Sequence, residues 1–87
     1  MTQYRVAEAM TKAVARADAA YTHSISHAPN PDSAEAEAEA NLAGRIAATE
    51  AMRGLGLTSG QRDLFAALAH AEAVQHRVLR ALAAAAA

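Results

Sequence analysis

Alanine restricts what this chain can fold into more than any other feature, because 27 of its 87 residues are alanine. Alanine has the highest helix propensity of all residues and is depleted in strands. Its single methyl group gains little from burial, so alanine-rich helices form readily but pack weakly. The chain is 53 % hydrophobic, yet more than half of those residues are alanines. One all-α domain with a small core is therefore predicted.

Prolines and glycines divide the chain into three helical segments. Pro29 disfavours the helical conformation in the residue before it, so the first helix is expected to end near His27. Gly54 and Gly56 offer the left-handed conformation at which helices stop, and they are expected to end the second helix. The expected helices span 2–26, 33–53 and 59–84 within a single domain, 1–87, that forms a three-helix chain or a kinked helical hairpin.

Capping residues mark where the second and third helices begin. Asp32 and Ser33 are alternative N-caps for the second helix, since both side chains can accept a hydrogen bond from a free backbone N–H. Thr58 and Gln61 have the spacing of a capping box, which predicts the start of the third helix.

Larger side chains recur at helical spacing and predict which face of each helix is buried. On the third helix the spacing alternates between four and three, which is typical of a coiled-coil seam, and Leu68 is expected in the core. Phe65 and Leu79 widen this stripe. The three expected stripes are Ala7, Met10, Val14, Ala17, Tyr21 and Ser24; then Leu42, Ile46 and Thr49; then Leu64, Leu68, Ala71, Gln75, Val78 and Leu82.

The second helix offers mainly Leu42, Ile46 and Met52 as large apolar residues, and these cannot cover the whole of the third stripe. Uncovered apolar surface tends to mark an interface. Domains of this size often need a staple or a partner chain, and the chain has no cysteine for a disulfide. Self-association into a homo-oligomer is therefore expected.

Charge and hydropathy exclude several classes of partner. The net charge is −1 and the pI is about 6.4, whereas a protein that coats DNA or RNA needs a basic surface. Polar residues near the start, from Gln3 to Glu8, occupy the place of a signal peptide's apolar core. The longest apolar run, 81–87, is far too short to cross a bilayer. A cytoplasmic protein with no membrane or nucleic-acid partner is expected, and the lack of cysteine is consistent with that.

Few residues have the spacing of catalytic or metal-binding groups. His23 and His27 lie four apart, as in half of a zinc site, but the alternative is two exposed histidines at a helix C-terminus, where positive charge is favoured. No nucleophile stands beside a base at motif spacing, and no glycine-rich phosphate loop is present. We expect no enzyme activity, no metal site and no cofactor. Glu72 and His76 are interpreted as a solvent-facing or interhelical pair, and Glu35 and Glu39 as a solvated face at the start of a helix.

Some side chains have the chemistry to bind bases and phosphates. Bases stack on tyrosine, and phosphates bind arginine and lysine. In the first turn of the third helix, Arg62 lies where backbone N–H groups already favour anions. Packing is the favoured interpretation of Tyr21, because it lies on the apolar stripe, whereas Tyr4 lies off the stripe. The candidates are Tyr4 and Tyr21 for stacking, and Arg5, Lys12, Arg16 and Arg62 for phosphates.

The segment His27-Ala28-Pro29-Asn30-Pro31, followed by two helices, resembles a family of small phage proteins. These sponge proteins sequester cyclic-nucleotide immune signals and so blunt anti-phage systems such as CBASS and Thoeris. In that family the last helix opens with an arginine–acid pair and leads through a leucine and alanine stripe to a glutamate. The matching positions here are Arg62-Asp63, Leu64 to Leu68, and Glu72, and the resemblance covers about residues 27–82.

The resemblance implies binding without turnover, with cyclic di- or trinucleotides held between the chains of an oligomer in the cytoplasm of an infected bacterium. The alternative is a small helical protein–protein interaction module without a small-molecule ligand, such as an antitoxin, an adaptor or a phage structural subunit. The expected ligand-binding residues are Tyr4, Arg5, Lys12, Tyr21, His27 and Arg62.

Overall fold

The computed structural model describes the backbone of residues 3–87 and the side chains from Arg5 onward. It contains α1 (Gln3–Ser26), α2 (Ala34–Ala51) and α3 (Ser59–Ala86), and the described residues form no strand. The prediction of an all-α chain of three helices is confirmed. Within residues 3–87, no helix combines the length and the apolar character that crossing a bilayer would require.

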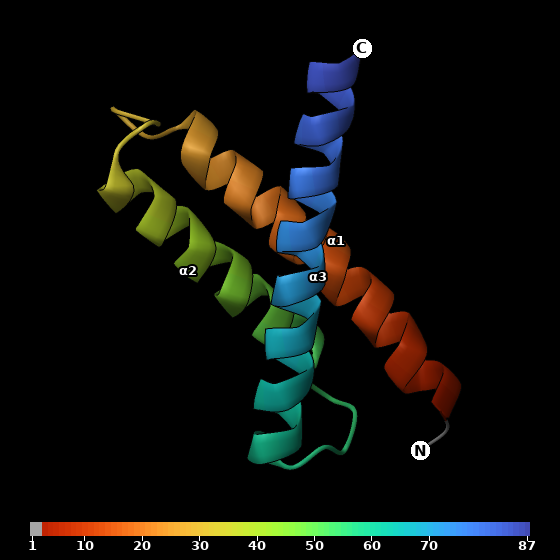
Figure 1. The fold of residues 1–87 in the computed structure, drawn as a ribbon. Helices are drawn as coiled ribbons and strands as arrows, with labels where there is room; N and C mark the ends of the chain where they lie inside the picture. Colours follow the sequence, from red (N-terminus) through yellow and green to blue (C-terminus); the bar gives the residue numbers. More distant parts are fainter. Residues whose placement is uncertain (1–2) are drawn as a thin grey trace.

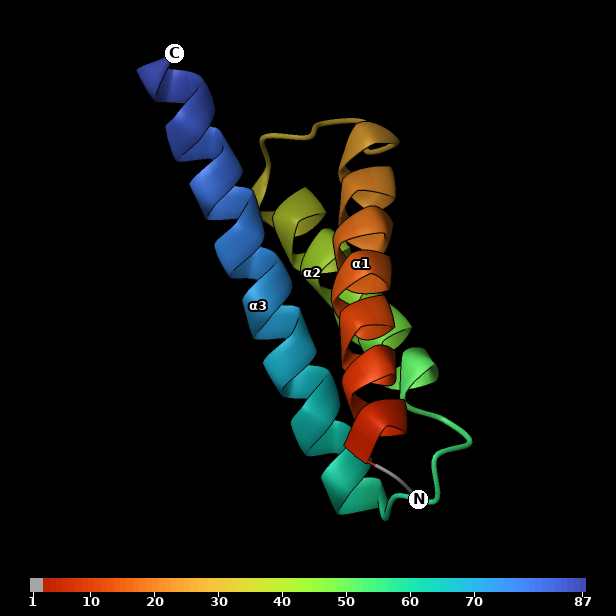
Figure 2. The same cartoon turned by 90° about the vertical axis from the view of Figure 1, so that its right-hand side faces the viewer.

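The first two helices form an antiparallel hairpin, and α3 lies across it as a second layer (Figures 1 and 2). The last turns of α3 project past the end of the hairpin, as Figure 2 shows from the side. One face of α3 therefore contacts α1 and α2, and the opposite face points away from both.

Local hydrogen bonds explain where the helices begin and end. Ser33, not Asp32, is the N-cap of α2, and its hydroxyl accepts from the N–H of Ala36 at 3.1 Å. At α3 the predicted capping box is present: the Thr58 hydroxyl accepts from the Gln61 N–H at 3.1 Å, and the Gln61 side chain accepts from the Thr58 N–H at 2.9 Å. Between these helices the chain turns through Gly54 and Gly56, which have φ angles of 75° and 71°.

The core is built almost entirely of alanine. Met52 is the largest side chain that is fully buried. At Gly44 the first two helices approach so closely that an added Cβ would lie 3.1 Å from the backbone oxygen of Ala17. Small residues permit this close approach, which gives many contacts per residue although each side chain buries little surface. The buried apolar residues are Ala9, Ala13, Val14, Ala17, Ala36, Ala40, Ala48, Met52, Ala66, Ala69 and Ala73.

The predicted buried faces of α2 and α3 are wrong. Leu42 and Ile46 of α2 are exposed, and Leu68, expected in the core, is 51 % exposed. On α1 the predicted stripe holds, with Val14 and Ala17 buried, except that its first member, Ala7, is exposed.

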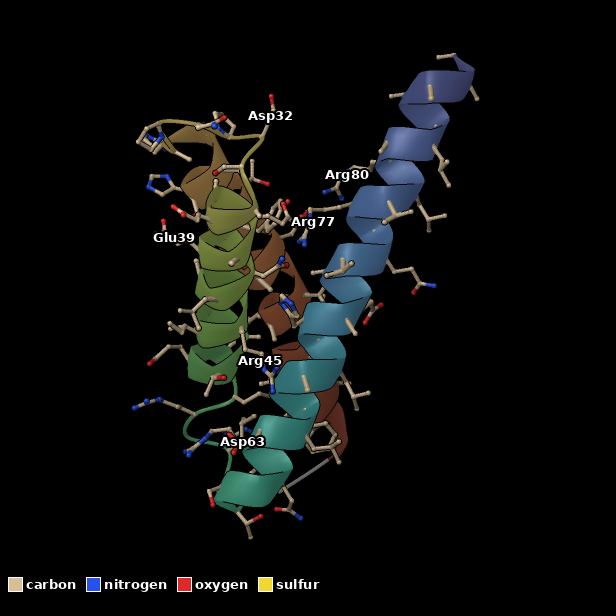
Figure 3. The ribbon with its side chains drawn as sticks, turned by 60° about the vertical axis from the view of Figure 1, so that its left-hand side comes forward. Asp32, Glu39, Arg45, Asp63, Arg77 and Arg80 are labelled. Atoms are coloured by element: carbon tan, nitrogen blue, oxygen red, sulfur yellow. The ribbon has the colours of Figure 1, made fainter. Side chains whose placement is uncertain are left out.

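The reason for the error is that α3 carries two regular stripes on opposite faces. Ala66, Ala69 and Ala73 recur at spacings of three and four, just as the leucines do. The alanine stripe continues into Arg77 and Arg80, which point toward the hairpin (Figure 3). If the leucines faced the hairpin instead, these two arginines would lose their contacts with it.

Candidate interaction surface

The outer face of α3 carries most of the large apolar side chains that the structure leaves in solvent. We call its stripe of Leu64, Leu68, Ala71, Gln75, Val78 and Leu82 the α3 seam. All six residues are exposed, and so is the neighbouring Leu79. The five large apolar side chains at 64, 68, 78, 79 and 82 have exposed fractions of 51–62 %.

Helix geometry places the α3 seam directly opposite the packed face. At about 100° per residue, the seam lies roughly half a turn around the helix from Ala66, Ala69 and Ala73. Its spacing of four and three residues is the repeat that allows one helix to pack along another. Its only strongly polar member is Gln75, and no position in the seam carries a charge. The surface therefore has the pattern of a helix-pairing face without a partner in the same chain.

A group of charged and polar residues joins the inner face of α3 to the hairpin. We call Asp18, Tyr21, Glu37, Arg77 and Arg80 the polar clasp. Arg80 donates to both carboxylate oxygens of Asp18, at 2.9 and 2.7 Å. A nitrogen of Arg77 lies 3.6 Å from the same carboxylate, and the Arg77 side chain is only 16 % exposed. The clasp thus joins α3 to α1 by contacts that depend on the orientation of α3.

Tyr21 and Glu37 extend the clasp to α2. The guanidinium carbon of Arg77 lies 3.5 Å from the centre of the Tyr21 ring, which is a cation–π contact. The Tyr21 hydroxyl donates a hydrogen bond to Glu37. This bond, together with partial burial and the charge of Glu37, raises the pKa of Tyr21 above 10.0, and the charge of Arg77 opposes the rise. The predicted packing role of Tyr21 thus describes its position better than a free base-stacking surface does.

His70 occupies the point where all three helices meet. Its Nδ1 would lie 3.4 Å from a Cβ added at Gly44, and it has no hydrogen-bond partner among the described residues. Burial lowers the pKa of His70 below 6.5, and the charges of Arg77 and Arg45 lower it further. His70 is therefore a neutral packing residue near neutral pH.

The structure brings two of the predicted ligand-binding residues together. Arg5 and Lys12 line one groove, together with Arg16 and with Arg53 from the end of α2. The side chain of Tyr4 lies outside the described residues. Tyr21 does not line this groove and belongs to the polar clasp, nine residues along α1 from Lys12.

His27 and Arg62 do not join that groove. His27 follows the end of α1, where its ring contacts the ring of His23 with centroids 4.1 Å apart and lies 2.8 Å from the His23 backbone oxygen. Arg62 is half-buried in the first turn of α3, and its Nε has no hydrogen-bond partner among the described residues. The six expected residues therefore do not form one site within a single chain.

The described residues contain no group of three or more side chains placed to hold a metal ion. His76 and Glu72 lie 3.7 Å apart on the exposed surface of α3. The nearby groove between α1 and α3 has an apolar wall of Met10 and Val14, with Asp18, Glu72 and His76 among its polar lining.

The clasp residues Asp18, Arg77 and Arg80 were missed by reasoning from the sequence. A signal was present, because Arg77 and Arg80 continue the spacing of the alanine stripe rather than that of the leucine stripe. Arg53 was also missed, since only the turn after α2 brings it beside α1. No family model, no curated protein and no solved structure matches the chain.

Proposed function

We propose that this protein is a helical interaction module that assembles by pairing the α3 seam with the seam of a second copy. The observation that carries the proposal is the inversion of residue size on α3, whose alanines face the hairpin while its leucines and valine face solvent. Monomeric proteins rarely leave a continuous apolar stripe exposed, and such stripes mark interfaces.

A second copy fits the seam for two reasons. Coiled-coil packing requires a partner helix with the same spacing of four and three residues. The α3 helix of a second copy has this spacing because its sequence is identical. The absence of charge from the seam means that two copies can meet without like-charge repulsion. A C2 dimer uses the same patch on both subunits, which is the commonest oligomer type.

The free energy gained by pairing two seams is comparable to the cost of association. Full burial of a leucine or valine side chain gains roughly 1.5–3 kcal/mol, so each half-exposed seam residue has about 1 kcal/mol left to gain. The four large apolar seam residues and the neighbouring Leu79, counted in each of two copies, give on the order of 10 kcal/mol. The estimated cost of bringing two chains together is about 4–15 kcal/mol. Closer packing of the two helices adds to this gain.

Sedimentation velocity and native mass spectrometry at micromolar concentrations test the proposal. The unmodified chain should be a dimer or a larger oligomer, and Leu68→Glu should be a folded monomer, because it places a charge in the seam. The matched control is Ala19→Glu, which adds the same charge at an exposed position on α1. An unmodified chain that stays monomeric throughout this range would contradict the proposal.

The resemblance to sponge proteins motivates a second proposal, in which the assembly sequesters a cyclic di- or trinucleotide. The gathering of Arg5, Lys12, Arg16 and Arg53 around one groove favours it, because arginine and lysine bind phosphates. A ligand that binds the folded state raises the melting temperature. Melting curves with and without cyclic di- and trinucleotides therefore separate this proposal from an interaction module without a small-molecule ligand.

A further inference from the structure

A groove between the first half of α1 and the end of α2 concentrates positive charge. Its volume is about 300 Å³, and its basic side chains are Arg5, Lys12, Arg16 and Arg53, which we call the cationic groove. These are four of the eight lysines and arginines in a chain whose net charge is −1. Two acidic residues, Glu8 and Glu50, also line it, and Ala9, Ala51 and Leu55 supply its apolar lining.

Helix geometry and the turn after α2 bring these side chains together. Positions 5, 12 and 16 are seven and four residues apart, so they lie within about 40° of one another around α1. Arg53 comes two residues after the last residue of α2, just before Gly54 turns the chain with a φ of 75°. A cation at that place is stabilised by the negative end of the helix dipole.

The charges in the groove are only partly balanced by the protein itself. Arg53 lies 3.2 Å from Glu50, which neutralises one cation. Among the described residues, Lys12 and Arg16 form no ion pair. Of the two carboxylates that line the groove, Glu8 is the one not paired with Arg53. The groove therefore keeps an excess of positive charge, and a bound anion would relieve the repulsion between neighbouring cations.

We propose that the cationic groove binds a phosphate-bearing small ligand, with its phosphates at Lys12, Arg16 and Arg53 and its less polar part on Ala9, Ala51 and Leu55. The volume lies at the lower end of the range for small-molecule sites, which fits a ligand of nucleotide size. The inference deepens the second proposal above by assigning a site within one chain, and it does not require assembly.

Isothermal titration calorimetry with ATP, inorganic pyrophosphate and a cyclic dinucleotide tests this site. Binding should weaken as salt rises, and ATP should bind more tightly than pyrophosphate because it adds a base to the phosphates. Arg16→Glu and Lys12→Glu should each weaken binding by about tenfold to a hundredfold, the value of a hydrogen bond to a charged group. The control is Arg45→Glu, the same charge change at an exposed residue of α2 outside the groove.

The mass of each sample, measured alongside, separates the two claims. A monomer that binds ATP through Lys12 and Arg16 would support the groove while contradicting assembly through α3. An oligomer that binds none of the three probes at millimolar concentration would overturn the groove alone. Binding that both charge reversals leave unchanged would also overturn it. Binding of linear ATP but not of the cyclic dinucleotide would support the groove and contradict a cyclic-nucleotide sponge.

Discussion

Leu68 and Ala69 are neighbours in the sequence but should respond to mutation in opposite ways. Leu68 is 51 % exposed on the α3 seam, whereas Ala69 is fully buried against the hairpin. Leu68→Ala should therefore weaken assembly and leave the fold of one chain nearly intact. Ala69→Leu should disturb folding at every concentration, because the added carbons meet a packed face.

The expected magnitudes follow from these exposures. Half of the Leu68 side chain is already buried within one chain, so its loss costs the monomer about 1 kcal/mol of unfolding free energy. The exposed half is lost from both copies of a dimer, which is about 2 kcal/mol and roughly a thirtyfold increase in Kd. Overpacking at position 69 should cost roughly 1–3 kcal/mol of unfolding free energy.

Two measurements separate these effects. Sedimentation velocity over a dilution series gives the Kd of assembly, and urea unfolding at the highest dilution gives the stability of the single chain. If Leu68→Ala instead cost 2–5 kcal/mol in the dilute chain, as for a packed core leucine, the leucines would face the hairpin and the reasoning would be refuted. A harmless Ala69→Leu would refute it independently.

Three further predictions concern contacts within the hairpin and between the hairpin and α3. Asp18→Asn should lower the free energy of unfolding by about 1–3 kcal/mol, because it leaves the half-buried Arg77 without its counter-charge. Glu50→Gln, in the exposed pair with Arg53, should lower it by less than about 1 kcal/mol in the same urea assay. Gly44→Ala should destabilise the fold, because the added Cβ meets the backbone of α1 at 3.1 Å. Gly60→Ala has open space around its Cβ and should raise the free energy of unfolding by up to about 1 kcal/mol. Equal melting temperatures for the two variants would contradict the close approach at Gly44. His70 has a lowered pKa in the folded chain, so the unfolded chain binds its proton first and stability should fall as the pH drops below 6.5; in His70→Gln that part of the pH dependence should disappear from urea unfolding curves.

The helices could be predicted from the sequence because their limits depend on local chemistry. The capping box at Thr58 and Gln61 requires only residues three apart. The left-handed turn at Gly54 and Gly56 requires only the absence of a side chain. Neither feature depends on which helix face is buried, so neither was affected by the error in the core.

The buried faces of α2 and α3 were predicted wrongly, because the prediction placed the large apolar residues inside. On α3 both stripes have helical spacing, and the buried one continues into Arg77, whose partner Asp18 lies 59 residues earlier in the chain. Arg77 and Arg80 share the spacing of the alanine stripe, but that spacing does not identify Asp18 as their partner. The cationic groove was likewise predictable only in part. Spacing alone places Arg5 and Lys12 on one face of α1, whereas Arg53 joins them only once α1 and α2 have packed.

The separation of the α3 seam from the cationic groove affects how the two proposals relate. The groove is lined by residues of α1, α2 and the loop after it, and no described residue of α3 contributes. The seam belongs to α3 alone and lies on the helix face opposite the buried alanines. Coupling between two sites needs a shared element with two arrangements that both sites bias. The contacts that join α3 to the hairpin, and so could transmit such a bias, include the polar clasp, His70 and the alanine face. Ligand binding should therefore influence assembly only if it changes the position of α3 on the hairpin. Asp18→Asn weakens the contact between Asp18 and the α3 arginines, so any coupling between ligand binding and assembly should change in this variant.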